Sequence, residues 1–195
     1  MNVAPGGWRW ALLIASPSVP AAFVTPYASV PFLLAGAFAL WFFRDPDRVP
    51  AGPGVVAPAD GTVSVVREQD DRLRVGVYMS AFDVHVNRAP LGGSVEAVEH
   101  TPGAHRPAFA KDSDRNERVA VDFGDHRVVL IAGWFARRIT PYVEMGDTLE
   151  RGDRLGHIAF GSRADVVLPA GYERGHLNVG EGDVVRAGET VLARQ

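Results

Sequence analysis

The stretch Gly146-Asp147-Thr148-Leu149-Glu150-Arg151-Gly152-Asp153 carries the clearest fold signal in the chain, because its pattern returns as Gly182-Asp183-Val184-Val185-Arg186-Ala187-Gly188-Glu189. Each copy reads as a glycine-aspartate turn, a short strand and a second glycine turn. From Pro50 onward the sequence consists of short valine-rich runs separated by glycine. Such runs between turn residues predict β-strands, which we expect at 55–56, 62–66, 73–78, 94–98, 119–123, 128–131 and 164–168.

The stretch Ala57-Pro58-Ala59-Asp60-Gly61-Thr62-Val63 resembles the opening of biotinyl and lipoyl carriers and of other barrel-sandwich hybrid domains. With the repeat, it predicts a mainly β fold in which residues 46–195 form a compact barrel-sandwich-hybrid-like β domain. A carrier domain needs a lysine at the tip of a hairpin. The chain has a single lysine, Lys111, in the polar run 111–115, so the sequence favours a solvated loop there and disfavours a carrier.

Residues 1–45 form a hydrophobic arm. The stretch 10–43 contains no charged residue and lies between Arg9 and Arg44. A single membrane span needs about 20 apolar residues, and prolines at 17, 20, 26 and 31 interrupt this stretch. We therefore expect a hydrophobic N-terminal helical hairpin that associates with the membrane without crossing it twice. Arginines at both ends predict that both ends lie at the cytoplasmic face of the cell membrane.

Two other interpretations of the arm stay open. A cleaved signal peptide would need a continuous apolar segment and a cleavage site, but proline breaks the first apolar piece. A soluble protein could instead bury the arm against itself. Tryptophans near both ends of the stretch, Trp8, Trp10 and Trp41, are typical of a membrane interface and favour the membrane-associated hairpin.

The composition excludes several classes of function. The formal net charge of −3 gives no electrostatic reason to expect a nucleic-acid partner. The chain has no cysteine, which excludes disulfides, thiolate zinc sites and cysteine nucleophiles. We expect no metal site. Lys111 lies among polar residues that would not desolvate it, so a lysine-based covalent mechanism is also disfavoured.

The pair Gly161-Ser162 lies within Phe160-Gly161-Ser162-Arg163-Ala164-Asp165-Val166-Val167-Leu168-Pro169 and is a candidate for self-cleavage. A serine hydroxyl can attack the carbonyl carbon of the preceding glycine and convert the amide into an ester. Elimination then leaves a second chain that begins with a pyruvoyl group, whose carbonyl condenses with amines and withdraws electrons from them. Glycine suits this position because it tolerates a strained backbone. An ordinary glycine-serine turn is the alternative.

Six motifs follow one another along the chain: Phe42-Phe43-Arg44-Asp45-Pro46, Pro58-Ala59-Asp60-Gly61, Phe82-Asp83-Val84-His85-Val86-Asn87-Arg88-Ala89-Pro90, Asn116-Glu117-Arg118, Ile131-Ala132-Gly133 with Ala136-Arg137-Arg138, and Phe160–Pro169. In this order they resemble one family, the short form of phosphatidylserine decarboxylase, including its archaeal archaetidylserine relatives. The likeness runs from about Trp41 to Gln195. Each motif is weak by itself, and their order makes the match specific.

The resemblance implies a zymogen of a pyruvoyl-dependent lyase in phospholipid biosynthesis. Cleavage between Gly161 and Ser162 would give a larger chain, 1–161, and a small pyruvoyl chain, 162–195, that stay together as a heterodimer. The covalent pyruvoyl cofactor would derive from Ser162. The enzyme would decarboxylate phosphatidylserine or archaetidylserine in the membrane to the ethanolamine phospholipid.

The family pattern further implies a serine-histidine-aspartate arrangement of Ser162, His85 and Asp60. His85 is expected to serve as base in cleavage and as acid in decarboxylation. The long enzymes of the family carry two histidines three residues apart, whereas this chain has Arg88 at the second position. Either His85 serves both reactions, or another histidine, such as His157, contributes.

The lipid phosphate calls for arginine, for which Arg88, Arg137 and Arg138 are candidates. Two other functions stay open. A pyruvoyl decarboxylase of a soluble amino acid would share the cleavage chemistry but would not need the apolar arm. A non-catalytic, membrane-anchored adaptor of the hybrid fold would not need Ser162.

Overall fold

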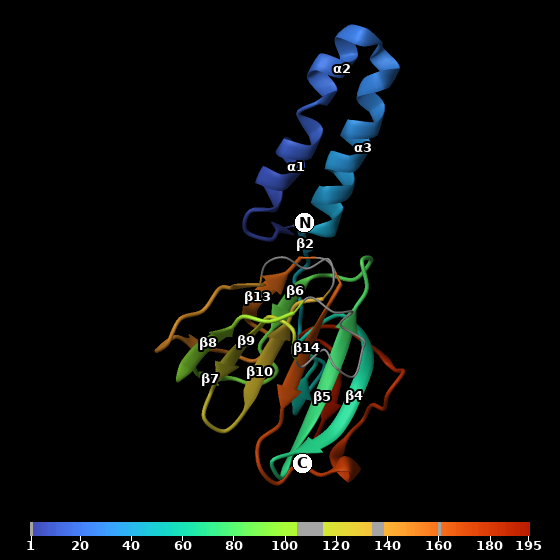
Figure 1. The fold of residues 1–195 in the computed structure, drawn as a ribbon. Helices are drawn as coiled ribbons and strands as arrows, with labels where there is room; N and C mark the ends of the chain where they lie inside the picture. Colours follow the sequence, from blue (N-terminus) through green and yellow to red (C-terminus); the bar gives the residue numbers. More distant parts are fainter. Residues whose placement is uncertain (1, 105–114, 134–138, 160) are drawn as a thin grey trace. The chain divides into compact units, whose positions relative to one another are not determined.

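The computed structural model describes residues 2–104, 115–133, 139–159 and 161–195. The chain divides into two compact units, Met1–Asp47 and Arg48–Gln195 (Figure 1). The first unit is helical and the second is built from β-strands. The expected mainly β fold with a hydrophobic N-terminal helical hairpin is therefore confirmed.

The first unit is a hairpin of α1 (Gly7–Ala15) and α2 (Ser18–Val24) against α3 (Pro26–Phe42), closed at its base by β1 (Asn2–Val3) paired with β2 (Arg44–Asp45) (Figure 1). Small residues allow the helices to approach closely. A Cβ atom on Gly36 would lie 2.8 Å from the Cβ of Ala15 and 3.1 Å from the carbonyl oxygen of Ala11. The hairpin thus packs through its small residues and leaves most of its large apolar side chains outside, whereas Phe42 and Phe43 are buried.

The turn between α2 and α3 contains the residues that start α3 and carries exposed apolar side chains. The hydroxyl of Thr25 accepts a hydrogen bond from the backbone N–H of Tyr27, and Pro26 occupies the first helical position. Next to this cap, Phe23 is 89% exposed and Val24 is 80% exposed. Among the described residues, no helix has the length and apolar character needed to cross a membrane.

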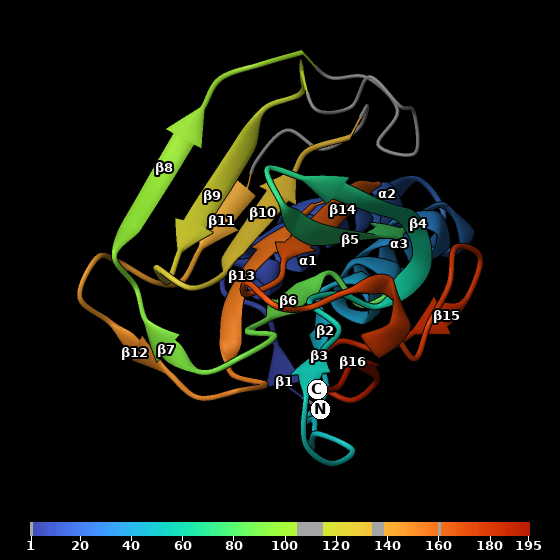
Figure 2. The ribbon, with the colours of Figure 1, turned by 90° about the horizontal axis from the view of Figure 1, so that it is seen from below.

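The second unit contains one seven-stranded antiparallel sheet and three smaller sheets. The large sheet has the order β15-β4-β5-β14-β10-β9-β8, and Figure 2 shows it curving around the core. The smaller sheets are β11-β13-β6, β12-β7 and β16-β3. The strands are β3 (Val55–Val56), β4 (Gly61–Gln69), β5 (Arg72–Met79), β6 (Val86–Arg88), β7 (Gly93–Ser94), β8 (Ala97–Thr101), β9 (Arg118–Asp122), β10 (Arg127–Ile131), β11 (Ile139–Pro141), β12 (Thr148–Leu149), β13 (Arg154–Ile158), β14 (Ser162–Val167), β15 (Val184–Val185) and β16 (Val191–Ala193).

The run 94–98, expected as one strand, is divided between β7 and β8. The backbone of Val95 bonds to the turn at Gly146 and Asp147, whereas the N–H of the next residue, Glu96, donates to Asp122 of β9. The chain therefore changes sheets between these two residues. The other expected strands lie within two residues of the observed bounds, except that β4 continues to Gln69, three residues beyond the end expected at 66.

The two glycine-aspartate turns of the sequence repeat belong to two matching halves of the fold. The N–H of Val63 donates to Asp183 at 2.9 Å, and that of Val95 donates to Asp147 at 2.8 Å. Equivalent bonds run from Gly188 to the carbonyl of Ala57 at 2.8 Å and from Gly152 to that of Ala89 at 2.9 Å. The segment 57–63 therefore has a structural counterpart in Ala89-Pro90-Leu91-Gly92-Gly93-Ser94-Val95.

Successive side chains of β14 point to opposite faces of the large sheet, one apolar and one polar. Ala164 and Val166 belong to the hydrophobic core. Asp165, which is fully buried, forms ion pairs with Arg74 at 2.5 Å and with Arg163 at 2.7 Å. Gly76 makes room for the carboxylate, since a Cβ atom there would lie 2.5 Å from its Oδ1 atom.

Gly76→Ala should lower the free energy of unfolding by about 1–3 kcal/mol, because the added methyl displaces Asp165 from its two arginines. Urea unfolding of the purified protein measures this change. Gly180→Ala is the matched control, since nothing lies within 4 Å of its added Cβ atom. Equal unfolding midpoints for the two variants would contradict the role given to Gly76.

Candidate active site

Ser162 is the first residue of β14 and is fully buried. It lies opposite Met79 of β5, and its hydroxyl points to the Sδ atom of Met79 at 4.0 Å. The preceding residue, Gly161, has a φ of +52°, a conformation that glycine adopts at little cost. The pair predicted to be cleaved therefore combines a left-handed glycine with a serine hydroxyl held in the protein interior.

His85 lies just before β6 and is 1% exposed. Its Nδ1 atom is 2.9 Å from the carbonyl oxygen of Asp83. The carboxylate of Asp83 accepts hydrogen bonds from the backbone N–H and the hydroxyl of Ser80, each at 2.7 Å, which fixes this turn. An Nδ1–H that donates to a carbonyl leaves Nε2 as the basic nitrogen of the ring, the form that a general base requires.

Asp60 lies in the turn before β4, mostly buried, and is held by groups from distant parts of the chain. Its Oδ2 atom accepts from the guanidinium of Arg48 at 2.7 Å, and its Oδ1 atom accepts from the backbone N–H of Ala187 at 2.8 Å. Arg48 also pairs with Glu189 at 3.2 Å. Burial raises the pKa of Asp60 above its ordinary value, while Ala187 and Arg48 oppose this shift.

The remaining predicted residues have different surroundings. Arg88 is buried, and its guanidinium donates to the carbonyl oxygen of Gly152 at 3.2 Å. His157 pairs with Val86 across the sheet, and its Nδ1 atom is 2.8 Å from the hydroxyl of Tyr142. The predicted phosphate ligands Arg137 and Arg138 lie outside the described residues.

Three residues near these groups carried no role in the sequence analysis. Arg48 is the ion-pair partner of Asp60, and Met79 contacts the hydroxyl of Ser162. Asn87 is fully buried, and its Nδ2 atom is 3.6 Å from the same Met79 sulfur atom. Only the position of Asn87, two residues after His85 in a family motif, could have drawn attention to it.

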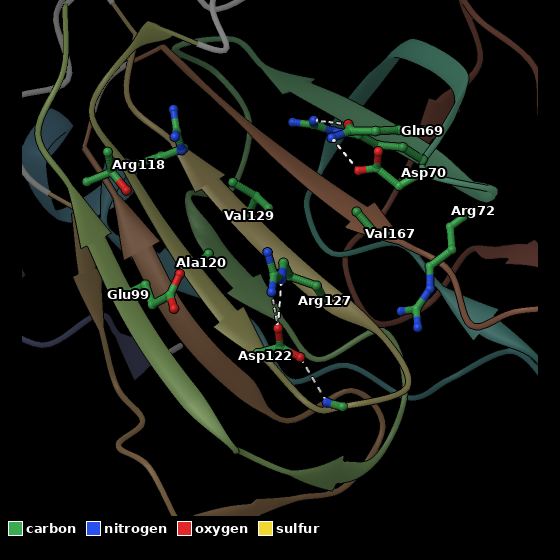
Figure 3. Close-up of a pocket in the computed structure, with 13 residues that line it drawn as sticks. Gln69, Asp70, Arg72, Glu99, Arg118, Ala120, Asp122, Arg127, Val129 and Val167 are labelled. Atoms are coloured by element: carbon green, nitrogen blue, oxygen red, sulfur yellow. Dashed lines mark hydrogen bonds and ion pairs between the residues drawn. The ribbon is translucent and has the colours of Figure 1, made fainter.

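A cavity of about 570 Å³ lies on the polar face of the large sheet (Figure 3). Charged side chains dominate its lining, including Arg118, Glu99 and the ion pair of Arg127 with Asp122. Its lining contains neither Ser162 nor His85 nor Asp60. The buried Ser162 and this charged cavity are therefore separate features.

The chain matches the family model described as phosphatidylserine decarboxylase over residues 35–193. It is 61% identical over 192 residues to a protein of Halobacterium salinarum provisionally named archaetidylserine decarboxylase proenzyme, with 97% of each chain covered. It is 50% identical over 171 residues to the phosphatidylserine decarboxylase proenzyme of Thermobifida fusca, covering 85% of this chain and 77% of that protein. The corresponding proenzyme of Streptomyces avermitilis is 48% identical over 171 residues, covering 85% and 78%. No solved structure matches the chain.

Asp60 should link stability to pH, because burial raises its pKa above 3.8. At a pH between the unfolded-state pKa of Asp60 and its higher folded-state pKa, the folded chain binds more protons than the unfolded chain. The contribution of Asp60 to the free energy of unfolding is therefore greatest at low pH and is lost as the pH rises through its folded-state pKa.

Asp60→Asn should remove this loss. Both chains would carry Ser162→Ala, so that cleavage does not intervene, and urea unfolding would be compared from about pH 4 to about pH 7. The difference in unfolding free energy between the two chains should change with pH in the acidic part of this range. A constant difference would contradict the raised pKa.

Proposed function

The chain belongs to the phosphatidylserine decarboxylase family, and from that membership we propose how its own residues produce the activity. The protein decarboxylates a serine phospholipid, phosphatidylserine or archaetidylserine, to the ethanolamine phospholipid. Family membership argues against a non-catalytic adaptor and against a soluble amino acid as substrate. The observation that carries the proposed mechanism is the buried hydroxyl of Ser162 directly after a glycine with a φ of +52°.

We propose that the protein first cleaves itself between Gly161 and Ser162. The hydroxyl oxygen of Ser162 attacks the carbonyl carbon of Gly161 as His85 takes its proton. The carbon–nitrogen bond breaks, and the serine nitrogen leaves protonated, so that an ester joins 161 to 162. Loss of the α-proton of Ser162 then expels the carboxylate of Gly161, giving the chains 1–161 and 162–195.

The sheet supports the proposal that the two chains remain together as a heterodimer. The strand β14 pairs with β10 along one edge and with β5 along the other, and both neighbours belong to the larger chain. The strands β15 and β16 pair with β4 and β3, which also belong to it. The small chain would therefore keep three strands within the larger one after cleavage.

The residues at the start of β14 fit a pyruvoyl group, because Ser162 is buried and its hydroxyl contacts the same Met79 sulfur atom as Asn87, which lies two residues after His85. A pyruvoyl group at residue 162 would supply a carbonyl able to condense with the amine of the serine headgroup and to accept the electron pair left when carbon dioxide departs. We propose that His85 then delivers a proton to the carbon that has lost carbon dioxide. The same histidine would thus act as base in cleavage and as acid in turnover.

Arg88 stands where the long enzymes of the family have a second histidine. Its guanidinium already donates to Gly152, and an arginine remains protonated at neutral pH, so it cannot act as a general base. This supports the assignment of both proton transfers to His85. Arg88, Arg137 and Arg138 remain our candidates for binding the lipid phosphate.

We propose that the helical hairpin brings the protein to the cytoplasmic face of the cell membrane. Large apolar side chains remain exposed along it, including Leu12, Val19 and Leu33 at 67%, 64% and 53%. Exposed apolar surface of this kind is typical of a segment that meets a lipid or protein partner. A phospholipid substrate makes lipid the natural partner.

Self-cleavage is tested by the intact mass of the purified protein beside Ser162→Ala. The wild type should give the chains 1–161 and 162–195, the shorter one with a blocked, ketone-bearing end. The Ser162→Ala chain should stay whole, because it lacks the attacking oxygen. Ser94→Ala, which removes an exposed serine hydroxyl, should cleave like the wild type. A wild type that remains a single chain would overturn the mechanism.

Membrane association is tested by the binding of the protein to vesicles of phosphatidylcholine and phosphatidylglycerol. Val24→Asp should weaken binding about tenfold or more, because it removes an apolar side chain that would enter the bilayer and adds a charge. Val184→Asp is the matched control, since this valine of the β domain is also 80% exposed. Equal binding by the two variants would argue against the hairpin as the membrane-binding element.

A further inference from the structure

Asn87 is a fully buried polar residue in β6, and its side chain shares one neighbour, Met79, with the serine of the proposed cleavage site. Its Nδ2 atom is 3.4 Å from the carbonyl oxygen of Pro58 and 3.6 Å from the Sδ atom of Met79. The Ser162 hydroxyl contacts the same sulfur atom. We propose that the Asn87 carbonyl oxygen accepts a hydrogen bond from the reacting amine, first that of Ser162 and then that of the substrate, an inference that rests on the proposed function.

The internal repeat of the fold places an apolar residue at the position that corresponds to Asn87. Asn87 pairs with Gly156 in one half, as Val55 pairs with Ala193 in the other. The next residues match too, because the N–H of Arg88 donates to Pro58 and that of Val56 donates to Pro90. The other half thus fills this position with valine, which is also fully buried.

The orientation of the amide leaves its oxygen available. The Nδ2 atom must face Pro58, because the reverse orientation would oppose two carbonyl oxygens. The Oδ1 atom has no hydrogen-bond partner among the described residues. A buried carbonyl without a donor is unfavourable, so a group at this position should be one that acquires a donor during function.

The proposed reaction supplies that donor. When the acyl group moves from nitrogen to oxygen, the carbon–nitrogen bond between Gly161 and Ser162 breaks, and the nitrogen gains a proton and becomes a primary amine. Asn87 can then accept a hydrogen bond from it and favour the ester. Elimination and hydrolysis later release this nitrogen as ammonia, and the substrate's amine bonds to the same carbon. One acceptor can therefore serve both amines.

Asn87→Val and Asn87→Thr test the proposal, because their side chains have nearly the same shape and only threonine keeps an oxygen. We expect the rate of self-cleavage, followed by intact mass, to fall about tenfold or more in Asn87→Val and to recover in Asn87→Thr. Hydroxylamine, which cuts esters, should release 162–195 from the valine variant slowly as well. The thermal midpoints of the two variants should agree.

Asn178→Val is the control, since the Asn178 amide also donates to a backbone carbonyl, that of Val191, at 3.4 Å. It should cleave like the wild type. Asn87→Ala removes the amide without adding bulk and should also cleave slowly. It tests the proposal if the valine variant does not fold. Equal cleavage and hydroxylamine rates for Asn87→Val, Asn87→Thr and wild type would overturn the proposal. A wild type that never cleaves would instead overturn the proposed function itself.

Discussion

Ser162 begins a strand that has neighbours on both of its edges, and this placement constrains the whole β domain. The strand β14 is hydrogen-bonded to β5 and β10, its apolar side chains enter the core, and its polar side chains form the buried Arg74–Asp165–Arg163 group on the other face. A buried carboxylate between two arginines tolerates little displacement, because a lost partner would leave an unpaired charge. The proposed cleavage site thus lies at the start of a strand that is paired on both edges and packed on both faces.

The matching halves of the β domain separate what the fold needs from what the chemistry needs. Asp60 corresponds to Gly92, and Asn87 corresponds to Val55, so each polar residue has a counterpart that cannot do its chemistry. Both halves nevertheless form the same turns and the same backbone hydrogen bonds. The other half of the domain therefore forms the same backbone pattern without the polar groups of Asp60 and Asn87.

Local patterns in the sequence were sufficient for much of this fold. Glycines 146, 152, 182 and 188 all adopt positive φ angles, as the repeat implied, and the valine-rich runs became strands. The split of 94–98 between two sheets was not predictable, because it depends on the distant turn at Gly146. The partners of Asp60 were hidden for the same reason, since Arg48 and Ala187 are brought to it only by folding. An asparagine between valine and arginine likewise reveals nothing of its burial.

The matching halves are nested along the chain, which matters for a protein that cuts itself. The segment 89–95 and its partner turn at 146–153 both precede Ser162, whereas 57–63 and its partner at 182–190 lie on opposite sides of the break. Once the chain is divided, the half that contains Asp60 is an association between two molecules. Refolding of this half then requires two chains to meet, so its rate depends on their concentration. After cleavage, the lifetime of the folded protein would therefore depend on slow unfolding more than on reversible refolding.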